Sequence, residues 1–187
     1  MEGFLLVFDI NDTLISKIKK TDKYVLDSLT DNQKNNTYSC NNHILLKRPL
    51  TDLLVKFLEI HNINYVFWST SMKHNIKKMI PYLEEIGYNF HLGYFGQEEC
   101  EEGIITEKIK AKNNIKNLEV VSKHFNVKLE QCVLIDNDIE KHVDGQNFIH
   151  VKEINLGHDE EIINICKKLD KFIDCQTKCF VKSLAVE

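Results

Sequence analysis

Short apolar runs alternate along the chain with longer stretches in which apolar residues recur at helical spacing. The short runs occupy residues 4–9, 63–70, 88–96, 132–136 and 147–151. The stretches with helical spacing occupy residues 45–61, 71–87, 113–125 and 159–173. Short apolar runs of this kind are typical of strands buried on both faces of a parallel sheet. Because strands alternate with helices, the pattern predicts an α/β fold with a central parallel sheet and helices on both faces.

Local signals mark where some of these elements begin and end. Thr51 follows Pro49 and is predicted to cap the first helix, and Gly87 is predicted to end the second. Pro81 lies inside the second helix and is expected to kink or break it. Residues 15–43 are polar instead, and the stretch TDNQKNNTYSCNN within them has the composition of a loop.

The composition is that of one ordinary globular domain. The chain has 187 residues, of which 43% are hydrophobic and 28% are charged. We assign residues 1–175 to a single domain, residues 15–43 to a flap or loop insertion within it, and residues 176–187 to a C-terminal tail. The formal net charge of -4 argues against nucleic-acid binding through a basic face, so no direct contact with nucleic acid is expected.

Cysteine usage and hydropathy favour an intracellular protein. The six cysteines form no CxxC pair, so neither a zinc site nor a disulfide framework is indicated and we expect reduced thiols. The first apolar run is too short for a signal peptide, and no stretch approaches the ~18 apolar residues of a membrane span. We expect a monomer in the cytoplasm or nucleus, without a membrane partner.

Polar side chains stand at the carboxyl ends of three predicted strands. They are Asp9 and Asn11 after the first strand, Ser69 after the second, and Asp136, Asn137 and Asp138 at a later one. Ligands of parallel α/β sheets bind beyond the carboxyl ends of the strands. Two carboxylates that meet there repel each other unless a cation lies between them, and Mg²⁺ is the cation that binds one or two carboxylates together with phosphate oxygens. The pattern predicts a site for Mg²⁺ and phosphate.

These residues resemble the motifs of the haloacid dehalogenase-like phosphatases. VFDINDTL matches the first motif at Asp9, Thr13 and Leu14, and YVFWST supplies Ser69 for the second. IKNLEVV offers Lys116 for the third motif, with Lys112 as the alternative, and VLIDND supplies Asp136 for the fourth. The motifs occur in order over residues 4–151, so the resemblance implies a Rossmann-like fold of this superfamily.

Within that superfamily the match is closest to the branch without a cap domain, because no helical domain fits between the motifs. LLKRPLTDLLVKFL, VFWSTS and VLIDND resemble stretches of the phosphatases that act on the RNA polymerase II C-terminal domain. The small magnesium-dependent phosphatases come second, through the spacing of KNLEVVSKHFNVKLEQ. The first resemblance implies an open cleft, bordered by residues 15–43, that admits phosphoserine or phosphothreonine in a protein segment.

The resemblance also implies a role for each matching residue. Asp9 would attack phosphorus to form an aspartyl-phosphate, and Ser69 with the amides after it would bind phosphate oxygens. Lys116 would balance the local charge. Mg²⁺ would be held by Asp9, Asp136 and the backbone carbonyl of Asn11. The further substrate-binding residues would be Thr13, Thr70 and Asn137.

Asn11 departs from the family pattern. Working members have Asp at this position, where it protonates the leaving oxygen and then activates water, and loss of such a group typically costs about 10²- to 10⁴-fold in rate. Asp12 is one residue further on, and the backbone turn should direct its side chain elsewhere. Two alternatives to a protein phosphatase therefore stay open: an impaired enzyme that binds phosphopeptides without turnover, or a hydrolase of small phosphate esters.

Overall fold

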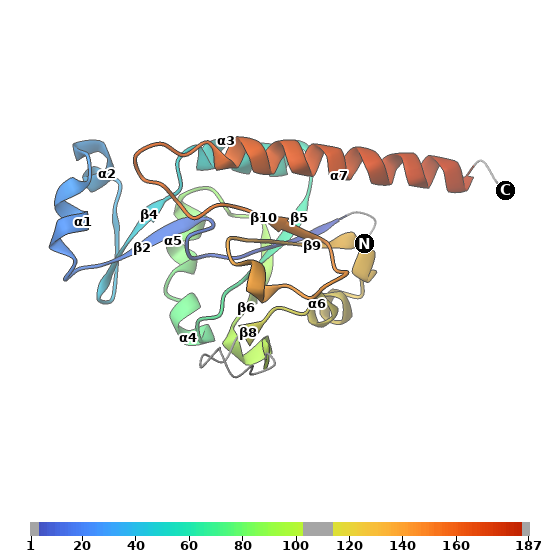
Figure 1. Ribbon diagram of the computed structural model, residues 1–187, viewed down its shortest axis with the longest axis horizontal. Helices are drawn as coiled ribbons and strands as arrows, with labels where there is room; N and C mark the ends of the chain where they lie inside the picture. Colours follow the sequence, from blue (N-terminus) through green and yellow to red (C-terminus); the bar gives the residue numbers. More distant parts are fainter. Residues whose placement is uncertain (1–3, 103–113, 185–187) are drawn as a thin grey trace.

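The computed structural model describes residues 4–102 and 114–184. Its centre is a five-stranded parallel sheet in the order β10-β9-β1-β5-β6 (Figure 1). The strands are β1 (Leu5–Phe8), β5 (Asn64–Trp68), β6 (His91–Phe95), β9 (Cys132–Asp136) and β10 (Phe148–His150). The predicted α/β fold with a parallel sheet is confirmed.

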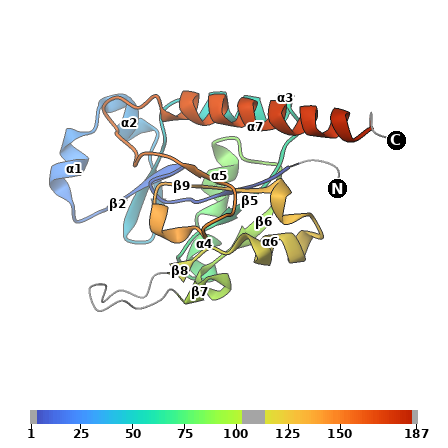
Figure 2. The ribbon, with the colours of Figure 1, turned by 45° about the vertical axis from the view of Figure 1, so that its right-hand side comes forward.

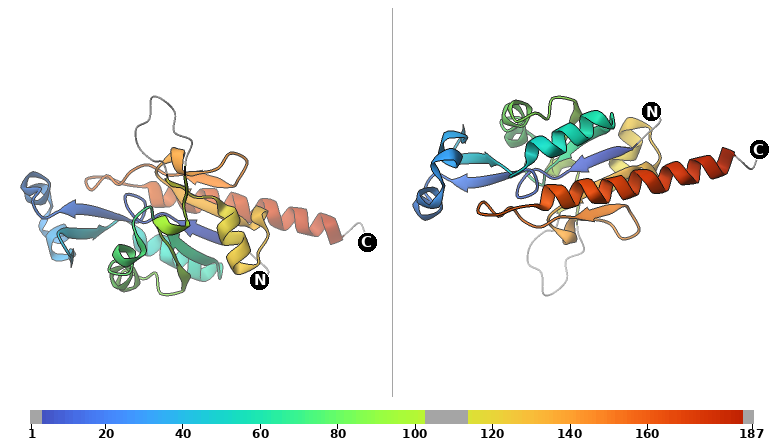
Figure 3. Two further views of the ribbon diagram at one scale, coloured as in Figure 1. Left: turned by 90° about the horizontal axis from the view of Figure 1, so that it is seen from below. Right: turned by 90° about the horizontal axis from the view of Figure 1, so that it is seen from above.

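Alternate residues of β1 are buried on opposite faces of the sheet, which explains its continuous apolar sequence. Leu6 and Phe8 belong to one core cluster, and Leu5 and Val7 belong to another. The first cluster includes residues of α3 (Thr51–Ile60), α5 (Ile80–Glu85) and α7 (Glu161–Leu184), and the second includes residues of α6 (Leu118–Phe125). Helices therefore cover both faces, with α7 lying along α3 (Figures 1 and 3).

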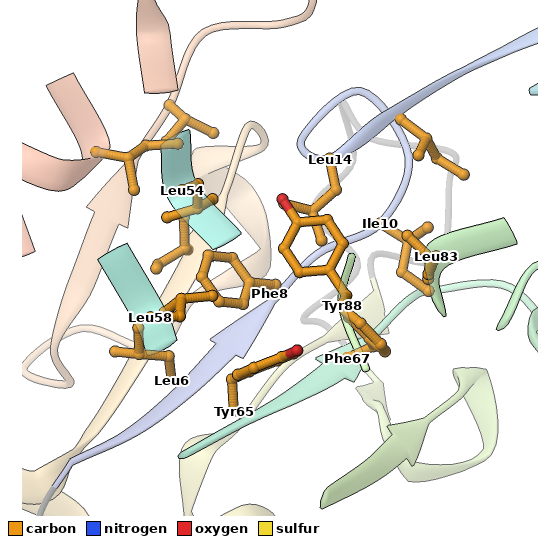
Figure 4. Close-up of a cluster of buried hydrophobic side chains, with 14 of the residues drawn as sticks. Leu6, Phe8, Ile10, Leu14, Leu54, Leu58, Tyr65, Phe67, Leu83 and Tyr88 are labelled. Carbon is orange, nitrogen blue, oxygen red and sulfur yellow. The ribbon is translucent and has the colours of Figure 1, made fainter. Parts of the chain in front are cut away.

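Aromatic rings fill the centre of the first cluster (Figure 4). The ring of Tyr65 meets those of Phe8, Phe67 and Tyr88 edge to face, with centroids 6.0, 5.8 and 6.1 Å away. Such edge-to-face pairs add to the free energy gained by burying the rings. Because this packing holds β1 between its neighbours, the residues after its carboxyl end start from a fixed position.

Residues 15–47 form a flap that projects from the body of the domain (Figures 1 and 2). Its strands β2 (Ile15–Lys19), β4 (His43–Lys47) and β3 (Tyr38–Cys40) make an antiparallel sheet in that order, and two short helices, α1 (Lys23–Ser28) and α2 (Asp31–Asn35), join β2 to β3. The loop predicted at residues 30–42 is wrong in part. A capping box between Thr30 and Gln33 starts α2, and Tyr38 of β3 stacks on Tyr82 of α5.

Two predicted helix details need correction or refinement. Thr51 does not cap α3 but is its first residue; its hydroxyl donates a hydrogen bond to the carbonyl of Arg48, at 2.7 Å, and Leu50 precedes it with a left-handed φ of 63°. The helix predicted at residues 71–87 is divided into α4 (Lys73–Ile76) and α5. Pro81 lies in the first turn of α5, where its missing N–H is tolerated, so the expected break is confirmed.

The remaining elements are short. They are the strands β7 (Glu101–Glu102) and β8 (Asn114–Ile115) and the 3₁₀ turns η1 (Gln97–Glu99), η2 (Leu129–Gln131) and η3 (Ile139–Lys141). Helix α7 continues to Leu184 and so includes residues 176–184, which the sequence analysis assigns to the C-terminal tail. Residues 4–102 and 114–184 contain no cap domain, and no helix among them is long and apolar enough to cross a membrane.

Candidate active site

The candidate site lies at the topological switch point of the sheet, where the strand order reverses. Strand β1 pairs with β5 on one side and with β9 on the other. The chain proceeds from β1 to β5 and β6, and then returns to β9 on the opposite side of β1. A crevice beyond the carboxyl ends of the strands is expected at such a switch point. Asp9, Ser69 and Asp136 stand at these three strand ends, as the sequence predicts.

A buried lysine joins the two strand-end carboxylates. The Nζ atom of Lys116 lies 2.6 Å from Oδ1 of Asp9 and 2.6 Å from Oδ2 of Asp136. Lys116 is fully buried, and both aspartates are buried as well. The backbone N–H of Lys116 donates to the carbonyl of Lys141, at 2.7 Å, which fixes the chain just before α6. Of the two lysines that the sequence left open, Lys116 therefore reaches the acids, whereas Lys112 lies outside the described residues.

Burial and charge act against each other in this triad. Burial raises the pKa of Asp9 to about 7; the charge of Lys116 opposes this rise and that of Asp136 adds to it. Burial alone would lower the pKa of Lys116, but the two carboxylates outweigh it and hold this pKa above its ordinary value. Two carboxylates and one ammonium leave a net negative charge in a buried place, and a further cation would offset it.

Asn11 lies against the serine at the end of β5. Its Nδ2 atom donates a hydrogen bond to Oγ of Ser69, at 3.3 Å, and the same Oγ accepts one from the backbone N–H of Ser71, at 3.2 Å. The Oδ1 atom of Asn11 is buried, and within the described part of the chain it has no hydrogen-bond partner. A buried polar atom without a partner costs free energy, so this oxygen is suited to accept a hydrogen bond from a ligand or water.

Thr13 and Asn137 link the loops that follow β1 and β9. The hydroxyl of Thr13 donates to Oδ1 of Asn137, at 3.1 Å, and accepts from the backbone N–H of Asn137, at 3.2 Å. The sequence analysis expected both residues to bind substrate. In the structure they contact each other and hold the two loops together. Thr70 is half-buried in the loop that leads from Ser69 to α4.

Three neighbouring residues have structural contacts that account for them. The backbone N–H of Asp138 donates to Oδ1 of Asp136, at 2.9 Å, while its own carboxylate caps η3 through the N–H of Glu140. Asp12 is exposed and has a left-handed φ of 59°, and its backbone N–H donates to the carbonyl of Ile15, at 2.8 Å. Trp68 is buried in the core, where its ring N–H donates to the carbonyl of Gly96.

Arg48 is a residue of this region that sequence reasoning did not assign. It is fully buried and forms an ion pair with Asp159, with Nη2 3.0 Å from Oδ2. Its Nη1 atom donates to the carbonyl of Thr13, at 2.9 Å, and its Nη2 atom to that of Lys152, at 2.6 Å. The sequence signal for Arg48 is its place in the LLKRPL stretch, which carries part of the family resemblance. Arg48 thus ties the loop after β1 to the start of α7.

The donor set fits Mg²⁺ better than a softer metal. Within the described residues no group of three or more His, Cys, Asp and Glu side chains lies close enough to hold a metal. Structural zinc sites need such a set, whereas Mg²⁺ takes one or two carboxylates and completes its shell with water and phosphate oxygens. Asp9 and Asp136 supply the two carboxylates, and Asn11 carries a backbone carbonyl in the same loop.

The fold is similar to that of solved structures of a haloacid dehalogenase-superfamily hydrolase and of CTD phosphatases. A superfamily hydrolase from Ehrlichia chaffeensis is similar with a TM-score of 0.52 and 13% identity, over 92% of this chain and 99% of that chain. A variant of the fission yeast RNA polymerase II CTD phosphatase Fcp1 bound to beryllium fluoride has a TM-score of 0.54 and 14% identity, over 93% of this chain and 51% of that one. A second Fcp1 structure has a TM-score of 0.56 and 12% identity, over 92% of this chain and 48% of that one.

The family within this fold follows from the sequence match. The family model described as NLI interacting factor-like phosphatase matches residues 4–179, and the chain belongs to this family. No curated protein sequence is similar enough to count as a match. The chain spans about half the length of the two Fcp1 chains.

Proposed function

We propose that the protein is a magnesium-dependent phosphatase that forms an aspartyl-phosphate on Asp9 and acts on phosphoserine or phosphothreonine in a protein segment. The observation that carries this proposal is the buried arrangement in which Lys116 contacts Asp9 and Asp136 at 2.6 Å each, at the switch point of the sheet. Membership of the NLI interacting factor-like phosphatase family supports it. The buried Oδ1 atom of Asn11, which has no partner among the described residues, adds a group that can accept a hydrogen bond from a ligand two residues after Asp9.

The residues divide the reaction into two displacements. A carboxylate oxygen of Asp9 attacks phosphorus, and the bond from phosphorus to the substrate oxygen breaks. Water then attacks the same phosphorus, which releases phosphate and restores the carboxylate. Lys116 offsets the charge of Asp9 and Asp136, and the hydroxyl of Ser69 with the amides after it binds phosphate oxygens. Mg²⁺, when bound by Asp9, Asp136 and the Asn11 carbonyl, supplies positive charge toward the phosphate.

Asn11 limits the proton transfers in this scheme. The leaving oxygen needs a proton in the first step and the attacking water must lose one in the second, and a side-chain amide does neither near neutral pH. Asn11 donates to Ser69 instead. This contact favours a second candidate function, a phosphopeptide-binding protein with little turnover, because it leaves the phosphate-binding groups in place.

The open surroundings of the site support a macromolecular substrate. The described residues form no cap domain, and the flap continues from the loop after β1 as a three-stranded sheet. A protein segment can reach a site that no cap covers, whereas a small metabolite is better held by an enclosed pocket. The partner we propose is therefore a phosphorylated segment of another protein.

The two candidate functions are separated by combining a binding measurement with a rate. Beryllofluoride, which mimics an acyl phosphate, should attach to wild-type protein in the presence of Mg²⁺ and give a ¹⁹F NMR signal that Asp9→Asn removes. Hydrolysis of p-nitrophenyl phosphate at a measurable rate would support the enzyme. Beryllofluoride binding with no hydrolysis of either p-nitrophenyl phosphate or a phosphoserine peptide would favour the binding protein. Absence of both signals would contradict the site itself.

A further inference from the structure

Within the described residues, the outer edge of strand β6 pairs with no other strand. This strand is the last of the central sheet, and β5 is its neighbour on the inner side. The backbone N–H of Ser69 donates to the carbonyl of Phe95, at 3.2 Å, so the backbone groups of Phe95 face β5. In a parallel strand the N–H and C=O of one residue point to the same side, and successive residues alternate. The N–H and C=O of Tyr94 therefore face the open edge.

These two groups of Tyr94 have no partner in the part of the chain that the structure describes. No hydrogen bond from outside the pairing of β5 with β6 reaches them. The preceding residue, Gly93, is open as well, because a Cβ atom at its position would meet no atom within 4 Å apart from its chain neighbours. A strand edge with unpaired N–H and C=O groups is a template for pairing with another strand.

A groove with a volume of about 290 Å³ lies along the same part of β6. Residues 92–95 line it, together with Val120 and Phe125 of α6, which pack on the core of that face of the sheet. The formally charged side chains of its lining are those of Lys73 and Glu99, and they form an ion pair with each other. The groove therefore presents backbone hydrogen-bonding groups and apolar side chains, while its charges are already paired.

The usual protections of a sheet edge are weak at β6. Proteins shield such edges with charged side chains, with proline, with bulges or by making the strand very short. The sequence of β6, HLGYF, has no proline and no formally charged residue, and the register shift in its pairing lies before Tyr94. At the opposite edge, β10 has three residues, and the carbonyl of its His150 already accepts a hydrogen bond from Lys168, at 2.8 Å. Of the two edges, β6 is therefore the one available to a further strand.

We infer that this edge binds an extended, uncharged segment of a partner protein, which adds a sixth strand to the sheet beside β6. The backbone of such a segment pairs with the N–H and C=O of Tyr94, and an apolar side chain packs against Val120 and Phe125. A compact apolar ligand fits less well, because it would remove the two groups of Tyr94 from water without giving them partners. The inference goes beyond the proposed phosphatase activity and does not require Asp9 to react.

The test follows backbone amide exchange in the ¹⁵N-labelled full chain by NMR. In dilute protein alone, the N–H of Tyr94 should exchange about tenfold or more faster than that of Phe95, whose backbone faces β5. The probe is a six-residue peptide of alternating Thr and Val with blocked ends, which is uncharged and favours the extended conformation. At saturation it should slow the exchange of the Tyr94 N–H about tenfold, and the same peptide methylated on every amide nitrogen should not.

Two substitutions at the edge test the assignment through the peptide affinity, measured from chemical-shift changes. Tyr94→Pro removes the outward N–H but leaves the pairing with β5, and it should weaken binding about threefold to tenfold, whereas Tyr94→Phe should leave the affinity unchanged. Leu92→Lys provides a second variant that keeps the backbone intact. Leu92 is 41% exposed, so the fold should tolerate the lysine, and its charge in the groove should also weaken binding.

The other outcomes would overturn the inference. Slow exchange of the Tyr94 N–H in dilute protein alone would mean that this chain already covers the edge. Protection of Tyr94 that increases with protein concentration, without peptide, would assign the edge to a second copy of the chain. Peptide binding that protects β10 or the flap instead of Tyr94, or no binding at all, would remove β6 as a docking edge.

Discussion

The side-chain amide of Asn11 donates a hydrogen bond to the hydroxyl of Ser69 across 3.3 Å, from the loop after β1 to the end of β5. This contact orients the amide beside a hydroxyl that we propose to be a phosphate ligand. A carboxylate in the same place could carry a proton to or from the substrate, whereas the amide cannot. A change at residue 11 alone should therefore alter proton transfer while leaving the phosphate-binding groups in place.

Replacing Asn11 by Asp should restore the missing proton carrier. We expect kcat/KM for a phosphoserine peptide to rise by about 10²-fold or more, because an alkoxide leaving group needs the acid. For p-nitrophenyl phosphate the increase should be much smaller, since its leaving group is stable without a proton. The measurement is kcat/KM for both substrates at fixed Mg²⁺, for wild type and Asn11→Asp.

Binding should change little in the same variant. The backbone carbonyl of residue 11 is retained, and a new carboxylate near Asp9 would weaken phosphate affinity, if at all, through charge repulsion. Asn11→Ala serves as the control, because it removes the contact with Ser69 without adding an acid. High and equal activity of wild type and Asn11→Asp on the peptide would show that another group, such as Asp12 or a bound water, transfers the proton.

Magnesium affinity should depend on Asp136 and not on its neighbour Asp138. The carboxylate of Asp136 faces Lys116 in the buried site, whereas that of Asp138 caps a 3₁₀ turn. We expect Asp136→Ala to abolish binding of Mg²⁺, or of Mn²⁺ as its spectroscopic substitute, and Asp138→Ala to retain it within about threefold. Isothermal titration calorimetry on the two variants measures this difference. Similar affinities in both would remove Asp136 from the metal site.

Periodicity and strand-end chemistry were sufficient to predict the sheet and the convergence of the acids. Each apolar run from residue 4 onward became a parallel strand, because a strand buried on both faces has no alternative environment for its side chains. Asp9, Ser69 and Asp136 then had to meet, since the carboxyl ends of parallel strands share one edge. The roles assigned to these residues stay predictions.

The features that the sequence did not predict, strand β3 and the buried Arg48, depend on tertiary contacts. The segment around Tyr38 looks like a loop by composition, yet it forms a strand because it pairs with β4 and stacks on Tyr82. Arg48 has no periodicity that announces a buried cation, because its partner Asp159 is more than a hundred residues away in the sequence. Contacts between such distant residues are invisible to local patterns, whereas Pro81 breaks a helix through its own ring and was therefore predictable.

Removing the ammonium of Lys116 should destabilise the fold. In Lys116→Met the carboxylates of Asp9 and Asp136 would face each other without their shared partner, and breaking a buried ion pair of this kind costs about 3–5 kcal/mol. Part of this loss should be recovered at millimolar Mg²⁺, which offsets the same charges by binding the folded state. Urea denaturation with and without Mg²⁺ measures both effects, with Lys128→Met as the exposed control. A loss below about 1 kcal/mol would contradict the buried triad.

The ion pair between Arg48 and Asp159 should show strong coupling in a double-mutant cycle. Arg48→Met leaves the Asp159 carboxylate buried and unpaired, and Asp159→Asn does the same to the Arg48 guanidinium, so each should cost about 3–5 kcal/mol in the free energy of unfolding. The double variant leaves no unpaired charge and should cost less than the two together, by about 1–3 kcal/mol. The control cycle uses Lys47 and Asp52, a more exposed pair whose charged atoms are 2.9 Å apart, where coupling should stay below about 1 kcal/mol. Additive losses at Arg48 and Asp159, measured by urea denaturation, would show that the backbone carbonyls and not the carboxylate hold the guanidinium.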